Sequence, residues 1–197
     1  TLGSASLGSA ITITGHTSAA DTLSVAGSSV DLSSATLSSL EILTAGYSGG
    51  TVFTLGSSTL AAGMTLSGHS SASDSLRLSG SALNLASATL SSLEVLSFGL
   101  SSGSVLSLDA ADLASGGTVA GHAAGTETLV AVGNALTLTS TTLSSLEVLA
   151  AGYSGGTTFT LDAADLASGG TVAGHSSGAD TLAAAGATLA LTSTVLS

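Results

Sequence analysis

The stretch Leu37-Ser-Ser-Leu-Glu-Ile-Leu43 decides the fold, because close copies of it return at a fixed distance. Leu90-Ser-Ser-Leu-Glu-Val-Leu96 and Leu143-Ser-Ser-Leu-Glu-Val-Leu149 each follow the preceding copy by 53 residues. A Gly-His pair keeps the same step, at Gly15-His16, Gly68-His69, Gly121-His122 and Gly174-His175. A fixed period of this size is the signature of a repeat architecture, in which each unit packs against its neighbours.

The period divides the chain into one array of about 3.7 repeats, at residues 1–53, 54–106, 107–159 and, incomplete, 160–197. Short runs of alternating apolar residues, such as Ile11-Thr-Ile13, are separated by glycines, which predicts short half-buried strands joined by tight turns. Apolar positions stay apolar from unit to unit, so we expect equivalent residues to stack on one another. The sequence predicts an all-β fold, a parallel β-solenoid built from 53-residue repeats of two or three coils each.

Two kinds of segment have the spacing of a helical turn: residues 34–41, and residues 109–115 with their copy at 162–168. Each begins with Ser or Asp, which suits a helix N-cap, but each is too short to be a stable helix alone. We therefore expect short helical corner turns there. The Leu-x4-Leu pattern of residues 32–37 returns at residues 55–60, which indicates more than one coil per unit.

The composition excludes several classes of partner. The net charge is −11, with twelve acids against the single cation Arg77, so the lysines and arginines that bind nucleic-acid phosphates are missing. The same acidity disfavours an anionic membrane surface, and no apolar run approaches the ~20 residues of a membrane helix. We expect no nucleic acid partner and no membrane insertion. The absence of cysteine removes disulfides from the stability of the fold.

Each Gly-His pair is followed by an acid five residues after the histidine. The pairs are His16 with Asp21, His69 with Asp74, His122 with Glu127, and His175 with Asp180. A histidine beside a carboxylate is suited to metal binding or proton transfer. Successive histidines are at least two coils apart, roughly 10 Å, too far to share one metal ion. A hydrogen-bonded turn that repeats with the unit is therefore the favoured interpretation.

Further acids form two candidate cation sites. Glu41, Glu94 and Glu147 give one acid per unit, either as a cation ladder or, as we favour, as solvated residues between inward leucines. Another group is confined to the last two units: Asp109, Asp112, Asp162 and Asp165. Calcium is the candidate ligand there, because hard cations bind oxygen. Earlier units carry Gly56 and Thr59 at the matching positions, so such a site is not essential to every unit.

No catalytic motif is present: there is no Gly-x-Ser-x-Gly elbow, no phosphate-binding loop and no His-Glu-x-x-His. Polar features occur in three or four copies, whereas catalytic sites are singular, so we expect no enzyme. Ice binding requires two regular threonine files. Four threonines align across the repeats, at Thr12, Thr65, Thr118 and Thr171. The residues two positions later are Thr14, Ser67, Ala120 and Ala173, which disfavours ice binding.

Two stretches carry a family resemblance. Gly174-His-Ser-Ser-Gly-Ala-Asp-Thr-Leu182 resembles the Gly-x-Gly-x-Asp-x-Leu nonapeptide of repeats-in-toxin proteins. Leu143-Ser-Ser-Leu-Glu-Val-Leu149, followed by Thr160-Leu-Asp-Ala-Ala-Asp-Leu166, is similar to the long repeats of large bacterial surface proteins and adhesins. The resemblance implies type I secretion, an extracellular or cell-surface location in a bacterium, and calcium as a candidate ligand.

The sequence favours a structural function. Both ends of the chain align with the middle of a unit and neither has a divergent polar cap, so we expect a window of a longer array or a filament subunit. Uncapped coils favour end-to-end self-association. We expect a segment of an extracellular filament, surface layer or adhesin stalk. The alternatives are an adhesive or calcium-binding solenoid module and, more remotely, an ice-binding solenoid.

Overall fold

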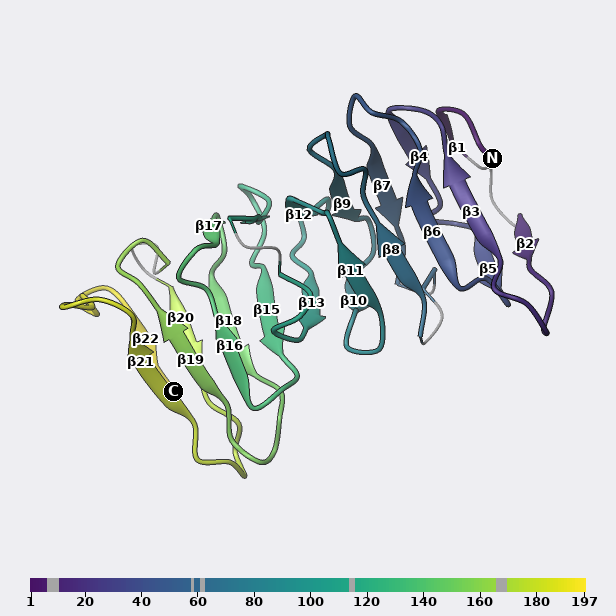
Figure 1. Cartoon of the computed structure of the whole chain (residues 1–197). Helices are drawn as coiled ribbons and strands as arrows, with labels where there is room; N and C mark the ends of the chain where they lie inside the picture. Colours follow the sequence, from purple (N-terminus) through teal and green to yellow (C-terminus); the bar gives the residue numbers. More distant parts are fainter. Residues whose placement is uncertain (7–10, 58, 61–62, 114–115, 166–169) are drawn as a thin grey trace.

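The computed structural model of the chain is an elongated stack of coils with its termini at opposite ends (Figure 1). It describes all residues except 7–10, 58, 61–62, 114–115 and 166–169. All strand pairs of the described residues are parallel. The fold is therefore a parallel β-solenoid, which confirms the predicted fold class.

Successive strands of the chain lie on three different sides of the solenoid, which we call sides A, B and C. Side A contains β2 (Thr12–Thr14), β5 (Thr36–Ser38), β10 (Ala82–Asn84), β13 (Val105–Leu108), β15 (Thr128–Ala131), β18 (Val148–Ala151), β20 (Thr171–Ala173) and β22 (Val195–Leu196). Side B contains β3 (Thr22–Val25), β6 (Ile42–Ala45), β8 (Thr65–Ser67), β11 (Thr89–Ser91), β16 (Ala135–Thr137), β19 (Thr158–Leu161) and β21 (Thr181–Ala184). Side C contains β1 (Ala5–Ser6), β4 (Ser29–Asp31), β7 (Val52–Leu55), β9 (Ser75–Leu78), β12 (Val95–Phe98), β14 (Thr118–Ala120) and β17 (Thr142–Ser144).

One coil contains about 23 residues. Val30 pairs with Phe53, and Phe53 pairs with Leu76, so the chain returns to side C after each 23-residue step. Other strand pairs of neighbouring coils are offset by 20, 24 or 25 residues, because the corners differ in length. The chain makes about eight coils. At the usual strand spacing of ~4.8 Å, this gives a rod roughly 40 Å long.

The repeat and the coil have different lengths. Each full repeat has six strands and a strandless seventh position, where Leu60 or Leu113 packs partly buried against the core. With three positions per coil, seven positions make two and a third coils. The Leu-Ser-Ser strands therefore fall on side A (β5), then side B (β11), then side C (β17). The expectation that equivalent residues stack was wrong: the residues that stack occupy different positions of the repeat.

The core is a narrow file of aliphatic side chains. Alternation along each strand turns every second residue inward, as in β7, where Phe53 and Leu55 are fully buried. Burial of one such side chain stabilises the fold by about 1.5–3 kcal/mol. Parallel pairing places inward residues of neighbouring coils directly over one another, so Phe53 lies between Val30 and Leu76. The core is therefore continuous along the rod.

The predicted helical corner turns were wrong where the structure describes them. Residues 34–41 contain strand β5, and Ser39 then adopts a left-handed conformation with φ of 49°, which no α-helix accommodates. Residues 109–113 form a hydrogen-bonded turn without a helix; residues 114–115 and 166–168 lie outside the described part. In that described part, no helix has the length and apolarity needed to cross a membrane.

Candidate functional site

The Gly-His loop and the Ser-Ser-Leu-Glu corner are stacked neighbours. β5 pairs with β2 and β6 pairs with β3, so the corner at residues 39–41 lies one coil above the loop at residues 15–21. The next repeat places the corner at residues 92–94 above the loop at residues 68–74 in the same way. The two most regular motifs of the sequence therefore meet in space, and their residues form the candidate site.

The acid of the loop bonds to main-chain groups of its own and neighbouring coils. Asp74 is fully buried. Its Oδ2 accepts a hydrogen bond from the His69 main-chain N–H at 2.6 Å, and its Oδ1 accepts one from the Thr51 N–H, one coil below, at 2.5 Å. The Asp74 N–H donates to Oε2 of Glu94, one coil above, at 2.8 Å. We call this Asp–Glu arrangement the corner staple.

The staple is largely repeated. Oδ2 of Asp21 and of Asp180 accepts the main-chain N–H of the histidine five residues earlier. Asp180 also accepts the N–H of Thr157 at 2.7 Å, as Asp74 does for Thr51. The three equivalent residues Thr51, Ser104 and Thr157 also form hydrogen bonds through their side chains. Each hydroxyl group donates to a glycine carbonyl 24 residues earlier. Sequence reasoning missed these three hydroxyl residues, although their 53-residue spacing marks them.

The predicted acidic column is absent as a column. Glu41, Glu94 and Glu147 each accept the main-chain N–H of the loop acid 20 residues earlier, at 2.8, 2.8 and 2.9 Å. They lie at three different corners, because the strands that follow them, β6, β12 and β18, lie on sides B, C and A. Their carboxylates therefore bind the backbone of a neighbouring coil and do not line one surface.

Backbone geometry explains why glycine and serine recur at the staple. Ser39, Ser92 and Ser145 have φ of 49°, 50° and 49°, in the left-handed region that side chains disfavour. This conformation brings each serine carbonyl over the glycine of the loop below. A Cβ on Gly68 would lie 1.7 Å from the carbonyl oxygen of Ser92, so only glycine fits there.

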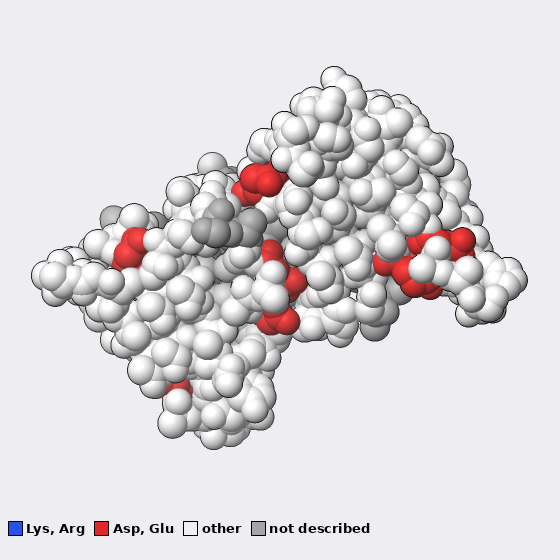
Figure 2. Space-filling model, viewed as in Figure 1, with Lys and Arg blue, Asp and Glu red and all other residues white. Residues whose placement is uncertain are grey.

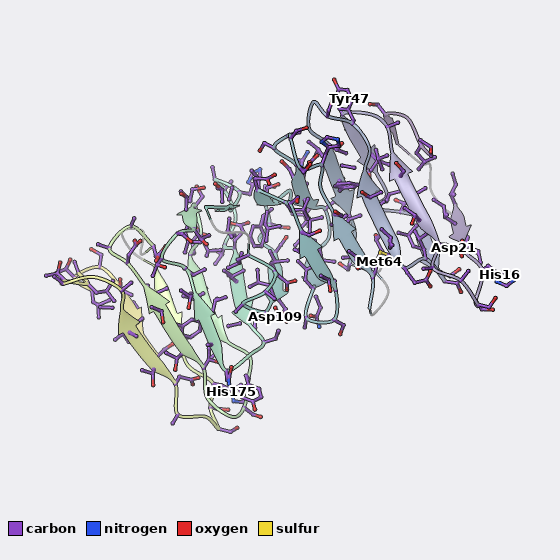
Figure 3. All side chains as sticks on the ribbon, viewed as in Figure 1. His16, Asp21, Tyr47, Met64, Asp109 and His175 are labelled. Carbon is purple, nitrogen blue, oxygen red and sulfur yellow. The ribbon has the colours of Figure 1, made fainter. Side chains whose placement is uncertain are left out.

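Each imidazole ring forms a hydrogen bond within its own loop. Nδ1 of His16, His69, His122 and His175 accepts the main-chain N–H of the residue two positions later, at 3.2–3.3 Å. In the neutral ring the proton therefore sits on Nε2. His16 and His175 share the corner between sides A and B, seven coils apart, and Figure 3 labels His16 at the right-hand end of the molecule and His175 at the lower left. The loops of His69 and His122 lie at the other two corners.

The calcium candidates close the strandless turn. Asp109 Oδ1 accepts the N–H of Ala111 at 2.8 Å, and Asp112 Oδ2 accepts the N–H of Asp109 at 3.0 Å. Asp162 and Asp165 repeat this geometry at 2.7 Å in both bonds. Asp112 and Asp165 are buried, and burial raises the pKa of each carboxyl to about 6.

Glu127 departs from the staple. The other three repeats have aspartate at this position, but the longer Glu127 is fully buried and neither of its carboxylate oxygens has a hydrogen-bond partner. Burial and the nearby Glu147 carboxylate raise the pKa of Glu127. A Cβ on Gly125 would lie 2.1 Å from Glu127 Oε1, so the missing side chain at Gly125 makes room for the longer acid.

The visible surface carries few charges, and its acids gather in small separate groups (Figure 2). Among the described residues, no three His, Asp or Glu side chains are placed to hold one metal ion. Outward neighbours follow the coil and not the repeat: Thr12 and Thr14 lie beside Thr36 and Ser38. Comparison of the chain with protein-family models, with curated proteins and with solved structures found no match.

Proposed function

We propose that the chain is a structural segment of an extracellular bacterial filament, surface layer or adhesin stalk. The observation that carries the proposal is the use of the repeated polar side chains. The loop acids of the first, second and fourth repeats, together with Glu41, Glu94 and Glu147, hold main-chain groups of their own or neighbouring coils. Side chains that stitch the backbone of a rod have little capacity left for an external ligand.

The placement of the repeats supports the same role. An adhesive or calcium-binding array gains avidity when equivalent groups line one surface. Here equivalent residues of successive repeats occupy different sides and return to the same side only after seven coils. The extracellular bacterial location rests on the resemblance to repeats of secreted surface proteins. The low count of Lys and Arg also removes cleavage sites for trypsin-like proteases, which suits an exposed rod.

Assembly along the axis is the second part of the proposal. Edge strands of an end coil offer unpaired N–H and C=O groups to the next coil, from a second copy or from further repeats of the same chain. Main-chain hydrogen bonds and stacked leucines would then continue across the junction. This association requires neither a metal ion nor a ligand.

Electron microscopy of the purified chain, in calcium and in chelator, tests the proposal. We expect uniform filaments of solenoid width in both conditions. A Leu196→Arg variant, with a charge on the exposed strand β22, should give separate short rods. Separate rods from the unaltered chain would contradict axial assembly. Filaments or a melting temperature that depend on calcium would favour a calcium-binding module instead.

A further inference from the structure

The two halves of the rod fill one buried position differently. In the first strandless turn, the Thr59 hydroxyl accepts the N–H of Gly56 at 3.0 Å and donates to the carbonyl of Leu32, in the coil below, at 3.2 Å. A hydroxyl serves both bonds because it has a proton and lone pairs. Thr59 is fully buried and fully satisfied.

Asp165 occupies the equivalent position two repeats later. It accepts the matching N–H, from Asp162, at 2.7 Å. An ionised carboxylate has no proton to donate, and Asp165 Oδ1 is buried without a hydrogen-bond partner. The Asp165 side chain is only 4% exposed. The acid reproduces both bonds of Thr59 only when it carries a proton.

The remaining orphaned oxygens lie beside the same glutamate. Among the described residues, the buried side-chain oxygens without a partner belong to Glu127 and Asp165. Glu147 accepts the Glu127 N–H at 2.9 Å, and it lines one small hollow together with Asp165. The Glu147 carboxylate adds to the effect of burial in raising the pKa of Glu127. Glu147 therefore neighbours both orphaned acids, Glu127 through its main-chain N–H and Asp165 across the small hollow.

Other charged groups do not balance these acids. His122, in the loop of Glu127, lowers the pKa of Glu127, but by less than burial and the Glu147 carboxylate raise it. The Nδ1 atom of His122 accepts the Ala124 N–H. Asp162 is the charged neighbour of Asp165 within its own turn. The coil below Glu127 contributes Gly103 and Ser104, which are uncharged. Buried carboxylates without a counter-charge or donors are costly and take up protons instead.

We propose that Glu127, Glu147 and Asp165 form a proton-binding cluster, and that protonation locks three coils of the second half of the rod together. Glu127 binds one proton beside the Glu147 carboxylate that holds its main-chain N–H, and Asp165 binds a second proton and becomes a donor like Thr59. The corner of Asp74 and Glu94 has no such dependence on added protons, because main-chain N–H groups supply donors to Asp74. This device is a property of the fold and holds whether or not the chain builds filaments.

The direction of the pH effect follows from linkage. Acids whose folded-state pKa is raised bind more protons in the folded than in the unfolded protein. Their contribution to stability is complete below the ordinary carboxyl pKa of ~4 and is lost as pH rises through about 6, the value for Asp165. The second half of the rod should therefore be firmer in mild acid than at neutral pH, with about a tenfold change in its opening equilibrium per unit of raised pKa.

Hydrogen exchange of the full chain at pH 5 and pH 7, corrected for intrinsic rates, tests this. We expect the Glu127 and Thr171 amides to be at least about tenfold better protected at pH 5. The Asp74 amide and the Thr65 amide, which follows the Thr59 turn and donates to the Glu41 carbonyl, should change much less. The double variant Glu127→Asp with Asp165→Thr copies the residues of the first half and should lose the difference. Equal protection at both pH values in the unaltered chain would overturn the proposal.

Carboxyl titration by nuclear magnetic resonance gives a second measurement that does not depend on unfolding. Glu127 should titrate well above the ~4.3 of an ordinary glutamate. An ordinary midpoint would contradict proton binding. If calcium at pH 7 raised the melting temperature of the unaltered chain but not of Glu127→Asp, the cluster would be a cation site and the proton proposal would be wrong.

Discussion

Replacement of Asp74 by alanine tests the corner staple most directly. The carboxylate is the acceptor for two buried N–H groups, those of Thr51 and His69, and Asp74→Ala removes both bonds. A buried N–H left without a partner costs about 1–3 kcal/mol, so for two such groups we expect a loss of about 2–6 kcal/mol in the free energy of unfolding. Domains of this size have only about 5–15 kcal/mol in total, so the variant should be severely destabilised.

Asp21→Ala is the matched control. Asp21 occupies the same place in the first repeat, but among the described residues its carboxylate accepts a single N–H, that of His16, in an exposed part of the rod. We expect a loss below about 1 kcal/mol, as for an exposed hydrogen bond. Asp74→Asn should fall between the two variants, since the amide keeps one acceptor oxygen and presents its NH₂ group to the other N–H.

Urea unfolding followed by circular dichroism measures the difference, with hydrogen exchange of the Thr51 and His69 amides as the local measurement. Solenoids can open in segments, so exchange distinguishes the loss of one corner from the loss of the whole rod. Equal destabilisation by Asp74→Ala and Asp21→Ala would refute the reasoning. Such a result would mean that neither burial nor the hydrogen bond to the neighbouring coil determines how much the staple acid contributes to the free energy of unfolding.

Three further predictions concern the backbone and the repeat. Gly68→Ala should prevent normal folding of its corner, because the new Cβ would lie 1.7 Å from the Ser92 carbonyl oxygen. Gly63→Ala meets no neighbouring atom and should lower the free energy of unfolding by only about 1–2 kcal/mol, because of its φ of +83°. Thermal melts of the two variants would measure the difference. Ser92→Gly should stabilise the chain by about 0.5–1 kcal/mol in the same melts, since glycine adopts the left-handed region freely; a clear loss would contradict this. Deletion of residues 54–106, one whole repeat, should leave the free energy of urea unfolding per coil unchanged, because every strand pairing keeps its offset. Deletion of residues 54–76, one coil, removes Asp74 and should destabilise the rod. Equal effects of the two deletions would refute the distinction between repeat and coil.

The class of fold follows from the sequence because it depends on local signals. Short alternating runs such as Ile11-Thr-Ile13, glycines between them and a fixed period are sufficient for a solenoid. The length of a coil cannot be read from the 53-residue period. The period is the distance between residues of equivalent sequence, whereas the coil length is the distance after which the chain returns to the same side of the solenoid. The 23-residue echo between residues 32–37 and 55–60 was the available signal, and it equals one coil.

The staple was harder to predict. Sequence reasoning favoured a hydrogen-bonded turn containing His69 and Asp74 but did not identify the bonding groups. The Asp74 carboxylate accepts the main-chain N–H of His69. Leu37 and Leu40 have helical spacing, but the left-handed Ser39 between them turns both inward from a corner. The stacking of Asp74 beneath Glu94 depends on the 20-residue offset of that coil, which no local pattern specifies.

Because one repeat is two and a third coils long, the number of repeats sets the direction in which the end of the rod points. Gain or loss of one 53-residue unit lengthens or shortens the rod by roughly 11 Å and also turns whatever follows by a third of a circle. Chains that differ by one or two units would therefore point their next segment in different directions, and a difference of three units would restore the original direction. Recombination between such units would change the length of the rod and the direction of the segment that follows it at the same time.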